Sequence, residues 1–270
     1  MKRFLLQVLL LTFLCVSTSF SEKNKTGVSS KNVIKMLTYN VHHCNPPDKH
    51  DVIDIAAIAA VIKQQKADIV ALQEIDVNTG RSGKINEAEQ LAVKAGYKSF
   101  FFAKAMDYDG GQYGIAILSK YQLTDTKAYN LPKDSSGNAG EQRMLATASI
   151  TLAGGKTIRI GCTHLEAYSK TSRQLQVEEI CRIGEATVFP FIIAGDFNAN
   201  EGSDVINTLD QHFRRTCNNC PPTFWEEGET GAIDFIAVKP EAAFTVLSHK
   251  VVQNKIASDH MPVLAELQLK

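Results

Sequence analysis

Short apolar runs and longer amphipathic segments alternate along this chain, and their order is the feature that most constrains its fold. Runs rich in β-branched and aromatic residues, typical of strands, occupy 33–41, 67–73, 98–104, 112–119, 121–130, 143–152, 156–164, 191–194, 232–238, 244–252 and 262–269. Segments with helical periodicity occupy 51–66 and 86–95, and we expect a third helix that Ser172 caps. Helices therefore interrupt two groups of strands.

Two groups of strands with helices beside them favour two packed β-sheets that carry helices on their outer faces. A doubly wound parallel sheet is the alternative. The turn at 153–156 joins two consecutive strands as a hairpin, which is an antiparallel connection and argues against that alternative. We see no linker, repeat or low-complexity tract after a polar leader at 22–32, so we expect 33–270 to form one domain.

The first residues have the parts of a secretory signal peptide. Lys2 and Arg3 precede an apolar run of about 13 residues, and the small residues Ser19 and Ser21 suit a cleavage site. The run is shorter than the roughly 20 residues that a membrane-spanning helix needs. We therefore expect cleavage after about residue 21 and a secreted (periplasmic or extracellular) mature chain without a transmembrane span.

Charge and cysteine content narrow the possible partners. The full chain has 29 basic and 29 acidic residues, and loss of the signal peptide would remove only basic ones. A slightly acidic mature chain has no overall attraction to polyphosphate, so nucleic acid is a possible but disfavoured partner. Cys217 and Cys220 could close a small disulfide loop after export, whereas Cys162 and Cys181 lie in apolar patterns typical of a core.

Polar residues stand at the ends of several apolar runs. Any one of them is an ordinary turn or loop residue. Asp234 is the strongest indication of a functional site, because a carboxylate between two apolar strand residues is rarely buried without a partner. Taken together they supply oxygen ligands and acid/base groups, which metal-assisted hydrolysis requires. The set is Asn40, Glu74, His164, Asp196, Asn198, Asp234, Asp259 and His260.

The segments around these residues resemble motifs of the endonuclease/exonuclease/phosphatase superfamily, which includes pancreatic-type deoxyribonuclease, apurinic endonucleases, neutral sphingomyelinases and inositol polyphosphate 5-phosphatases. They are TYNV at 38–41, LQE at 72–74, YGIAILS at 113–119, THL at 163–165, GDFN at 195–198, IDFI at 233–236 and SDHMP at 258–262. GDFN and SDHMP in this order, with LQE upstream, are specific in combination. The resemblance implies an α/β fold, a four-layer α/β/β/α sandwich with two packed mixed β-sheets and outer helices.

The resemblance also implies a metal site and a water-activating carboxylate. Glu74 would bind Mg²⁺ or Mn²⁺ with help from Asn40 and Asp259, because hard oxygen ligands suit these ions. Asp196 would orient or deprotonate the attacking water. Asn198 would donate a hydrogen bond to the phosphoryl oxygen.

Two histidines and an arginine would face the phosphate in the same scheme. Asp234 would fix the tautomer of His260 and raise its pKa, and His260 would then act as a base or as a cationic phosphate clamp. His164 would be a second phosphate-facing histidine. Arg143 matches a strand arginine whose fork suits phosphate oxygens, although a surface position is the alternative.

One position departs from the pattern, and two further arginines are candidates for substrate binding. Many nucleases of the superfamily carry a carboxylate two residues after the asparagine, where this chain has His42. Metal binding would then depend more on Glu74, and His42 could accept Mn²⁺ or a transition metal or contact the substrate. Arg81 and Arg173 follow the Glu74 and His164 strands and could bind an anionic group, with solvated surface positions as the alternative.

These observations favour a secreted, divalent-metal-dependent phosphoesterase or phosphodiesterase that uses an activated water. We expect a monomer that acts on a small phosphorylated substrate such as a sugar phosphate, a lipid headgroup or an inositol phosphate. A non-specific secreted nuclease is the alternative. A catalytically inactive binding module is disfavoured because the polar set is intact. The sequence names no substrate, because loops set specificity on a shared site.

Overall fold

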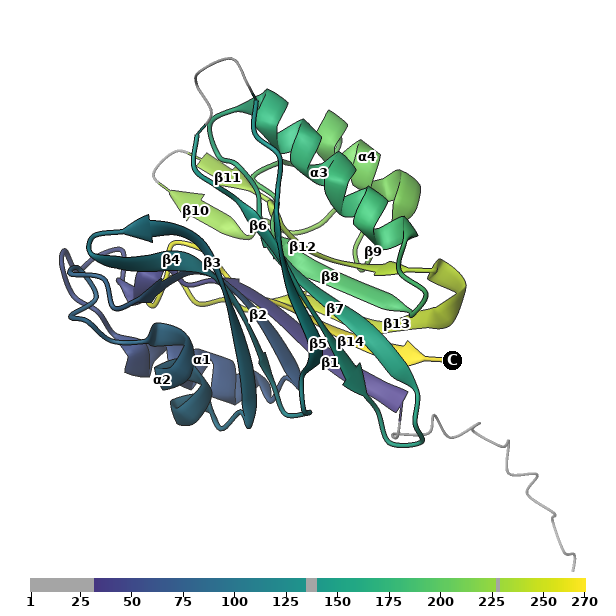
Figure 1. The fold of residues 1–270 in the computed structure, drawn as a ribbon, viewed down its shortest axis with the longest axis horizontal. Coiled ribbons are helices and arrows are strands. Elements are labelled where there is room, and N and C mark those ends of the chain that lie inside the picture. Colours follow the sequence, from purple (N-terminus) through teal and green to yellow (C-terminus); the bar gives the residue numbers. More distant parts are fainter. Residues whose placement is uncertain (1–31, 135–139, 227–228) are drawn as a thin grey trace, which may run out of the picture.

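Two six-stranded β-sheets pack face to face in this computed structural model, which describes residues 32–134, 140–226 and 229–270 (Figure 1). Across the first sheet the order is β13 (Phe244–Val251), β14 (Val263–Leu269), β1 (Val33–Asn40), β2 (Ile69–Val77), β4 (Gly111–Ser119) and β3 (Ser99–Tyr108). Across the second it is β5 (Thr124–Asn130), β6 (Met144–Thr151), β7 (Thr157–His164), β8 (Phe191–Asp196), β12 (Asp234–Lys239) and β9 (Arg214–Arg215). The signal peptide predicted at 1–21 lies outside the described residues.

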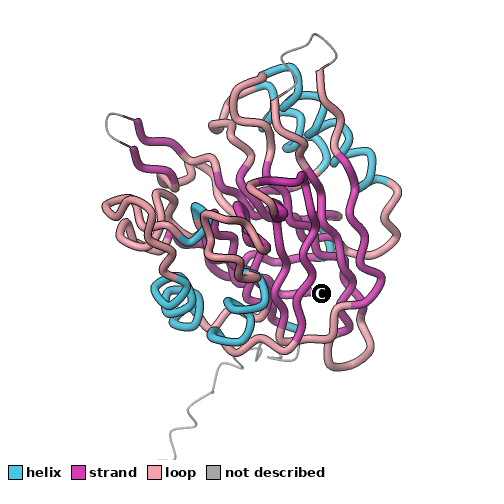
Figure 2. The backbone as a smooth tube through the Cα atoms, turned by 60° about the vertical axis from the view of Figure 1, so that its left-hand side comes forward, coloured by secondary structure: helices cyan, strands magenta, loops and turns pink. Residues whose placement is uncertain are grey.

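Helices cover the outer face of each sheet and complete four layers. The first sheet carries α1 (Ile55–Gln65) and α2 (Glu87–Ala95), and the second carries α3 (Lys170–Glu185) and α4 (Asp204–His212). The two helix pairs lie on opposite sides of the strands (Figure 2). Both sheets are mixed, because β1 pairs with β2 and β7 with β8 in parallel while the other pairs are antiparallel. The predicted four-layer sandwich is confirmed.

Three apolar clusters correspond to the three interfaces between these layers. The inner cluster joins the facing sides of the sheets through side chains such as Met36, Ile117 and Ile160, all fully buried. One outer cluster lies under α1 and α2, and the other lies under α3 and α4. Strands in the middle of the sandwich are apolar on both faces, which explains why β4 and β8 are continuous apolar runs in the sequence.

Helix starts differ from the predicted ones because capping side chains set them. Helix α1 begins at Ile55, after Asp54, whose carboxylate accepts a hydrogen bond from the backbone N–H of Ala57. The prediction that Ser172 caps the third helix was wrong. Ser169 is the cap of α3, and its hydroxyl accepts from the backbone N–H of Ser172, which lies buried in the first turn.

Several short elements, most of them in the carboxyl half, were not predicted. They are α4, β9, β10 (Phe224–Glu226), β11 (Glu229–Gly231) and the single-turn helices η2 (His42–Cys44) and η3 (Glu241–Ala243). Each is too short, or too polar along most of its length, to give a periodic apolar pattern. None of the described helices is long and apolar enough to span a membrane.

Strand pairing places the predicted polar residues at one end of the sandwich. His164 pairs with Asp196 across the parallel β7–β8 ladder, and Asp196 pairs with Asp234 across the antiparallel β8–β12 ladder. Asn40, at the end of β1, pairs with Gln73, the neighbour of Glu74. Residues that are far apart in the sequence are therefore brought to one edge by register alone.

Candidate active site

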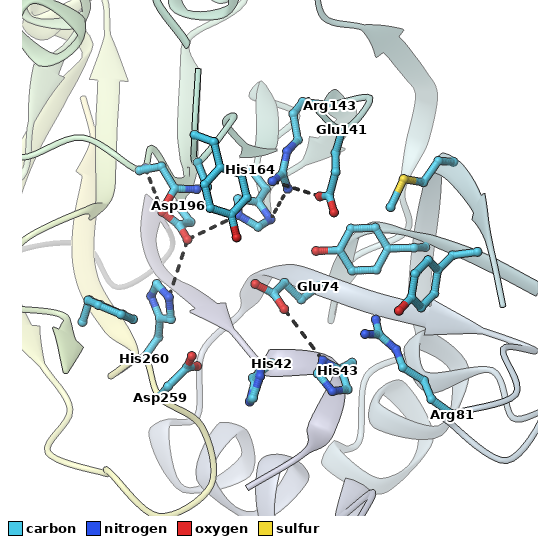
Figure 3. Close-up of a pocket in the computed structure, with 17 residues that line it drawn as sticks. His42, His43, Glu74, Arg81, Glu141, Arg143, His164, Asp196, Asp259 and His260 are labelled. Carbon is cyan, nitrogen blue, oxygen red and sulfur yellow. Dashed lines mark hydrogen bonds and ion pairs between the residues drawn. The ribbon is translucent and has the colours of Figure 1, made fainter. Parts of the chain in front are cut away.

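A cleft of about 350 Å³ opens at this end of the sandwich. Nine of the residues singled out in the sequence line it: His42, Glu74, Arg81, Arg143, His164, Asp196, Asn198, Asp259 and His260 (Figure 3). Asn40 and Asp234 are buried behind this lining and bond to it. Arg173 is not part of it. Its Nη1 donates to the backbone carbonyls of Glu166 and Ala167 at 2.6 and 2.8 Å, beside a neighbouring groove.

A β-bulge turns Glu74 toward the cleft. The β2–β4 register shifts between Leu72 and Ile75, and Glu74 has a φ of 58°, a conformation that costs energy for a non-glycine residue. Its side chain is 23% exposed, and Oε1 accepts from Asn40 Nδ2 at 3.0 Å. Burial opposes ionisation, but His43, Asn40 and the charge of His260 outweigh it and hold the pKa of Glu74 below its ordinary value. Glu74 therefore presents an anionic carboxylate.

Asn40 links the two carboxylates at the centre of the site. Its Nδ2 donates to Glu74 and also to Asp196 Oδ2 at 3.1 Å, while its Oδ1 accepts from the backbone N–H of His42 at 3.1 Å. The amide nitrogen, rather than the oxygen, thus faces the carboxylates. The role of Asn40 as a metal ligand stays a prediction, and in this arrangement it holds Glu74 and Asp196 in place.

Asp234 and His260 form a buried hydrogen-bonded pair. His260 Nδ1 lies 2.9 Å from Asp234 Oδ2, and the ring of Phe224 packs against the His260 ring with centroids 5.0 Å apart. Thr223 Oγ1 also donates to Asp234 Oδ2, at 2.6 Å. Burial would lower the pKa of His260, but Asp234 and then Asp196 outweigh it and raise it to about 10. The imidazole is therefore cationic at neutral pH, and its Nε2 lies 3.7 Å from Asp196 Oδ2.

Asp196 is poised to exchange a proton near neutral pH. Burial and then repulsion from Asp234 raise its pKa to about 7, against the lowering effects of His260 and of the hydrogen bonds from Asn198 and Asn40. Its Oδ1 accepts from the backbone N–H of Asn198 at 2.8 Å. A carboxylate whose pKa lies near the working pH is suited to act as a general base.

His164 is a neutral hydrogen-bond donor in this arrangement. Arg143 Nη1 lies 3.0 Å from His164 Nδ1, and a guanidinium can only donate, so Nδ1 carries the lone pair and Nε2 carries the proton. That N–H is directed toward Asp196 Oδ2 at 3.5 Å. Burial and the charge of Arg143 hold the pKa of His164 well below its ordinary value.

A left-handed turn places two histidines beside Glu74. His42, His43 and Cys44 all have φ between 40° and 56°, a strained run for residues other than glycine. His42 Nδ1 lies 3.0 Å from the carbonyl oxygen of Asn45, so Nδ1 carries a proton. His43 Nδ1 lies 3.8 Å from Glu74 Oε2. Strain of this kind is a recurrent feature of functional sites.

With this geometry established, comparison with known proteins identifies the fold family. The family model described as "Endonuclease/Exonuclease/phosphatase family" matches residues 37–260. The chain belongs to the endonuclease/exonuclease/phosphatase family. No curated protein matches it at a significant level.

Solved structures of other family members have the same fold. An endonuclease/exonuclease/phosphatase from Beutenbergia cavernae has 23% identity and a TM-score of 0.75, over 88% of this chain and 72% of that one. One from Bacteroides vulgatus has 22% identity and a TM-score of 0.74, over 89% and 100%. A mannosyl-6-phosphatase from Bacteroides thetaiotaomicron has 16% identity and a TM-score of 0.71, over 87% and 99%. At these identities the likeness shows the fold.

The donor set of this family member fits a hard divalent cation. Glu74 supplies an ionised carboxylate, and Asp259 lines the same cleft with its Oδ1 oriented by Ser258 Oγ at 3.1 Å. Oxygen ligands and a solvent-open cleft suit Mg²⁺, which keeps several waters. Asp196, Asp234 and His260 also offer ligand atoms within 4.8 Å of one another. The hydrogen bond between Asp234 and His260 already explains why these ligand atoms lie close together. Glu74 and Asp259 are therefore the better candidates for metal ligands.

Sequence reasoning missed the residues that hold the groups predicted to face a phosphate. Glu166 is fully buried, accepts from the backbone N–H of Glu141 and Tyr168, and lies 3.6 Å from Arg143 Nε. Arg143 is thus held by protein partners and orients His164. Thr223 and Glu166 stand in no recognisable motif, so no signal in the sequence indicated them.

The pKa of His260 predicts how the stability of the metal-free protein depends on pH. Its folded value of about 10 lies above the unfolded value of about 6.5, so its contribution is complete below pH 6.5 and is lost as pH rises toward 10. We expect the free energy of unfolding in chelator, from urea titrations, to fall across this window. The fall should be smaller in His260→Gln and unchanged in His212→Gln, which alters an exposed histidine. Equal falls in wild type and His260→Gln would contradict the assignment.

Proposed function

We propose that this chain is a divalent-metal-dependent hydrolase that cleaves small phosphate esters with an activated water. The observation that carries the proposal is the position of Asp196, a buried carboxylate with a raised pKa whose Oδ2 lies 3.5 Å from His164 Nε2 and 3.7 Å from His260 Nε2. A base that is free to accept a proton, beside two donors for an anion, is what attack of water on a phosphate ester requires. Family membership supports hydrolysis of phosphoester bonds.

Asp196 and His260 have different protonation states and therefore different roles in the reaction. Asp196 accepts a proton from water while the water oxygen forms a bond to phosphorus. The ester P–O bond breaks, and the departing oxygen takes a proton from solvent to leave as the alcohol. His260 is already protonated at neutral pH, so it stabilises charge on the phosphoryl oxygens rather than acting as the base. His164 donates from Nε2, and Asn198 lines the cleft beside them.

Glu74 and Asp259 would hold Mg²⁺ or Mn²⁺, which when bound neutralises phosphate charge and lowers the pKa of water. Asn40 fixes Glu74, and Ser258 orients Asp259. The remaining carboxylate in the centre, Asp196, is thereby kept for proton transfer. The cleft also contains Glu141, so an anionic substrate would meet several carboxylates without a cation.

A small substrate suits the cleft better than a polymer. Its volume of about 350 Å³ is at the lower end of small-molecule sites. The chain has equal numbers of acidic and basic residues, and the mannosyl-6-phosphatase among the solved structures with this fold acts on a phosphorylated sugar. We further propose that the mature protein is secreted, for which the N-terminal segment gives the support, and that it is monomeric.

A substrate panel tests this proposal. We expect metal-loaded enzyme to hydrolyse methyl phosphate, bis(4-nitrophenyl) phosphate or a sugar phosphate, and to degrade plasmid DNA poorly. The Michaelis constant for the preferred substrate should change little between 50 and 200 mM salt, because one or two phosphate contacts release few counterions. A site that contacts many phosphates would instead lose affinity by about 10³-fold or more over this range. Rapid plasmid degradation that salt suppresses steeply would instead establish a nuclease.

A further inference from the structure

Arg81 is fixed at the side of the cleft away from the acid/base groups. It lies on the far side of Glu74 from His260 and Asp196 (Figure 3). Its Nε and Nη2 donate to the two oxygens of Asp76 at 2.6 and 3.0 Å, and Asp76 is fully buried. Among the described residues, Nη1 has no hydrogen-bond partner. The guanidinium is therefore immobilised with one donor edge unused.

Two tyrosines make an aromatic wall beside this donor edge. The Arg81 Cζ atom lies 4.5 Å from the ring centroid of Tyr108 and 5.7 Å from that of Tyr113, and both tyrosines line the cleft. Tyr113 is 7% exposed and Tyr108 39% exposed. Burial holds the pKa of Tyr113 well above its ordinary value, so its hydroxyl stays a neutral donor. The wall thus combines apolar ring surface with hydrogen-bond donors.

Close backbone packing keeps the Arg81 loop and the β3–β4 hairpin together. A Cβ atom on Gly111 would lie 2.3 Å from the carbonyl carbon of Asn78, so only glycine allows this approach. Asp109, at the hairpin tip, accepts from the backbone N–H of Arg81 at 2.5 Å. Arg81 and Tyr108 therefore keep their relative positions when the cleft is empty, which limits the entropy lost on binding.

Local charge argues against a second anion at this position. The Arg81 guanidinium forms a bidentate ion pair with the buried carboxylate of Asp76, which neutralises its single positive charge. A neutral group that accepts hydrogen bonds and has an apolar face matches both the guanidinium edge and the tyrosine rings.

We propose that Arg81, Tyr108 and Tyr113 form a specificity subsite for a polyhydroxylated ring, so that the substrate is a phosphate ester of a hexose or cyclitol with one phosphate. The ring packs its C–H face on the exposed part of Tyr108, and its hydroxyls accept from Arg81 Nη1. This inference rests on the proposed hydrolase function. It selects sugar or cyclitol monophosphates over polyphosphorylated inositols, and it gives Arg81 the role of binding hydroxyls.

Three esters matched in shape test the subsite with magnesium-loaded enzyme. They are a hexose 6-phosphate, cyclohexylmethyl phosphate, which lacks the hydroxyls, and the hexose 1,6-bisphosphate, all supplied as methyl diesters if wild type prefers diesters. We expect kcat/KM for the hexose monophosphate to exceed that for the cyclohexyl ester by about 10- to 100-fold, the range for hydrogen bonds to a charged group. We expect the bisphosphate to be no better than the monophosphate.

Variants assign that preference to the subsite. Arg81→Lys keeps the charge opposite Asp76 but loses the planar guanidinium with its several donors. It should reduce the ratio of kcat/KM for the hexose ester to that for the cyclohexyl ester about tenfold. Tyr108→Ala, at an exposed position where folding is not at risk, should also reduce kcat/KM for the hexose ester. Phe189→Ala is the matched control, because Phe189 is 42% exposed and lies outside the cleft.

The outcomes separate this inference from the proposed function. Hydrolysis of the hexose and cyclohexyl esters with equal efficiency, or a ratio that Arg81→Lys leaves unchanged, would overturn the subsite while the hydrolase function stands. Preference for the bisphosphate that is lost in Arg81→Lys would show a second anion site instead. No hydrolysis of any ester, methyl phosphate included, would overturn both.

Discussion

Replacing His260 by alanine should lower kcat by about two to four orders of magnitude, the range for loss of a positioned acid/base or charge-stabilising group. His260 is the cationic group nearest Asp196 among the described residues, with Nε2 at 3.7 Å from Oδ2. In the proposed mechanism, its loss removes a donor to the phosphoryl oxygens and an ion that lowers the pKa of Asp196. Initial-rate measurements on the preferred ester would give the size of the effect.

Two further variants show whether this effect belongs to the buried pair. Asp234→Asn leaves the imidazole in place but removes the carboxylate that raises its pKa, so we expect a smaller loss of kcat with the fold retained, as circular dichroism would show. His212→Gln, far from the cleft, should have the wild-type rate. A wild-type rate for His260→Ala would remove His260 from the site.

Removal of divalent metal should abolish hydrolysis, and Mg²⁺ or Mn²⁺ should restore it. A cation at this position contributes several kcal/mol of transition-state stabilisation, which corresponds to about a thousandfold or more in rate. Glu74→Gln keeps the shape of the side chain and removes its charge. It should raise the metal concentration for half-maximal activity by about tenfold or more, because ligand charge sets affinity for hard cations.

The control for Glu74 is another partly exposed glutamate in the same sheet. Glu266 is 31% exposed in its side chain and pairs with Lys35 at 2.7 Å, away from the cleft. Glu266→Gln should leave metal activation unchanged. Full activity after exhaustive chelation, with metal content checked by elemental analysis, would rule out the metal-dependent mechanism.

The fold could be predicted from the sequence wherever apolar patterns are long. The strands of the two sheets give clear runs because the central ones are buried on both faces, and α1 and α2 show helical periodicity. The start of α3 was misplaced by one turn, because Ser169 and Ser172 are equally plausible caps and only the path of the preceding chain selects Ser169. Helix α4 has nine residues in a polar stretch, too few to reveal its buried side.

The members of the candidate site could be predicted, but their states and orientations could not. Motifs indicated that Glu74, Asp196 and His260 belong together. The sequence left open whether His260 is a base or a cation, because the answer depends on how close two buried carboxylates lie to its ring. The tautomer of His164 likewise depends on Arg143, which lies just before β6 and donates a hydrogen bond to His164 Nδ1. The aromatic wall formed by Tyr108 and Tyr113 depends on how the β3–β4 hairpin packs against the Arg81 loop, and no sequence motif indicates that packing.

The central claim is that a water activated at this cleft attacks phosphorus, and isotope transfer from solvent tests it most directly. Metal-loaded enzyme would hydrolyse the preferred ester in water labelled with oxygen-18, and mass spectrometry would locate the label in the products. We predict that the label enters the phosphate and not the alcohol, and that Glu74→Gln and chelator suppress its incorporation. Label in the alcohol, or incorporation that neither change reduces, would contradict the account.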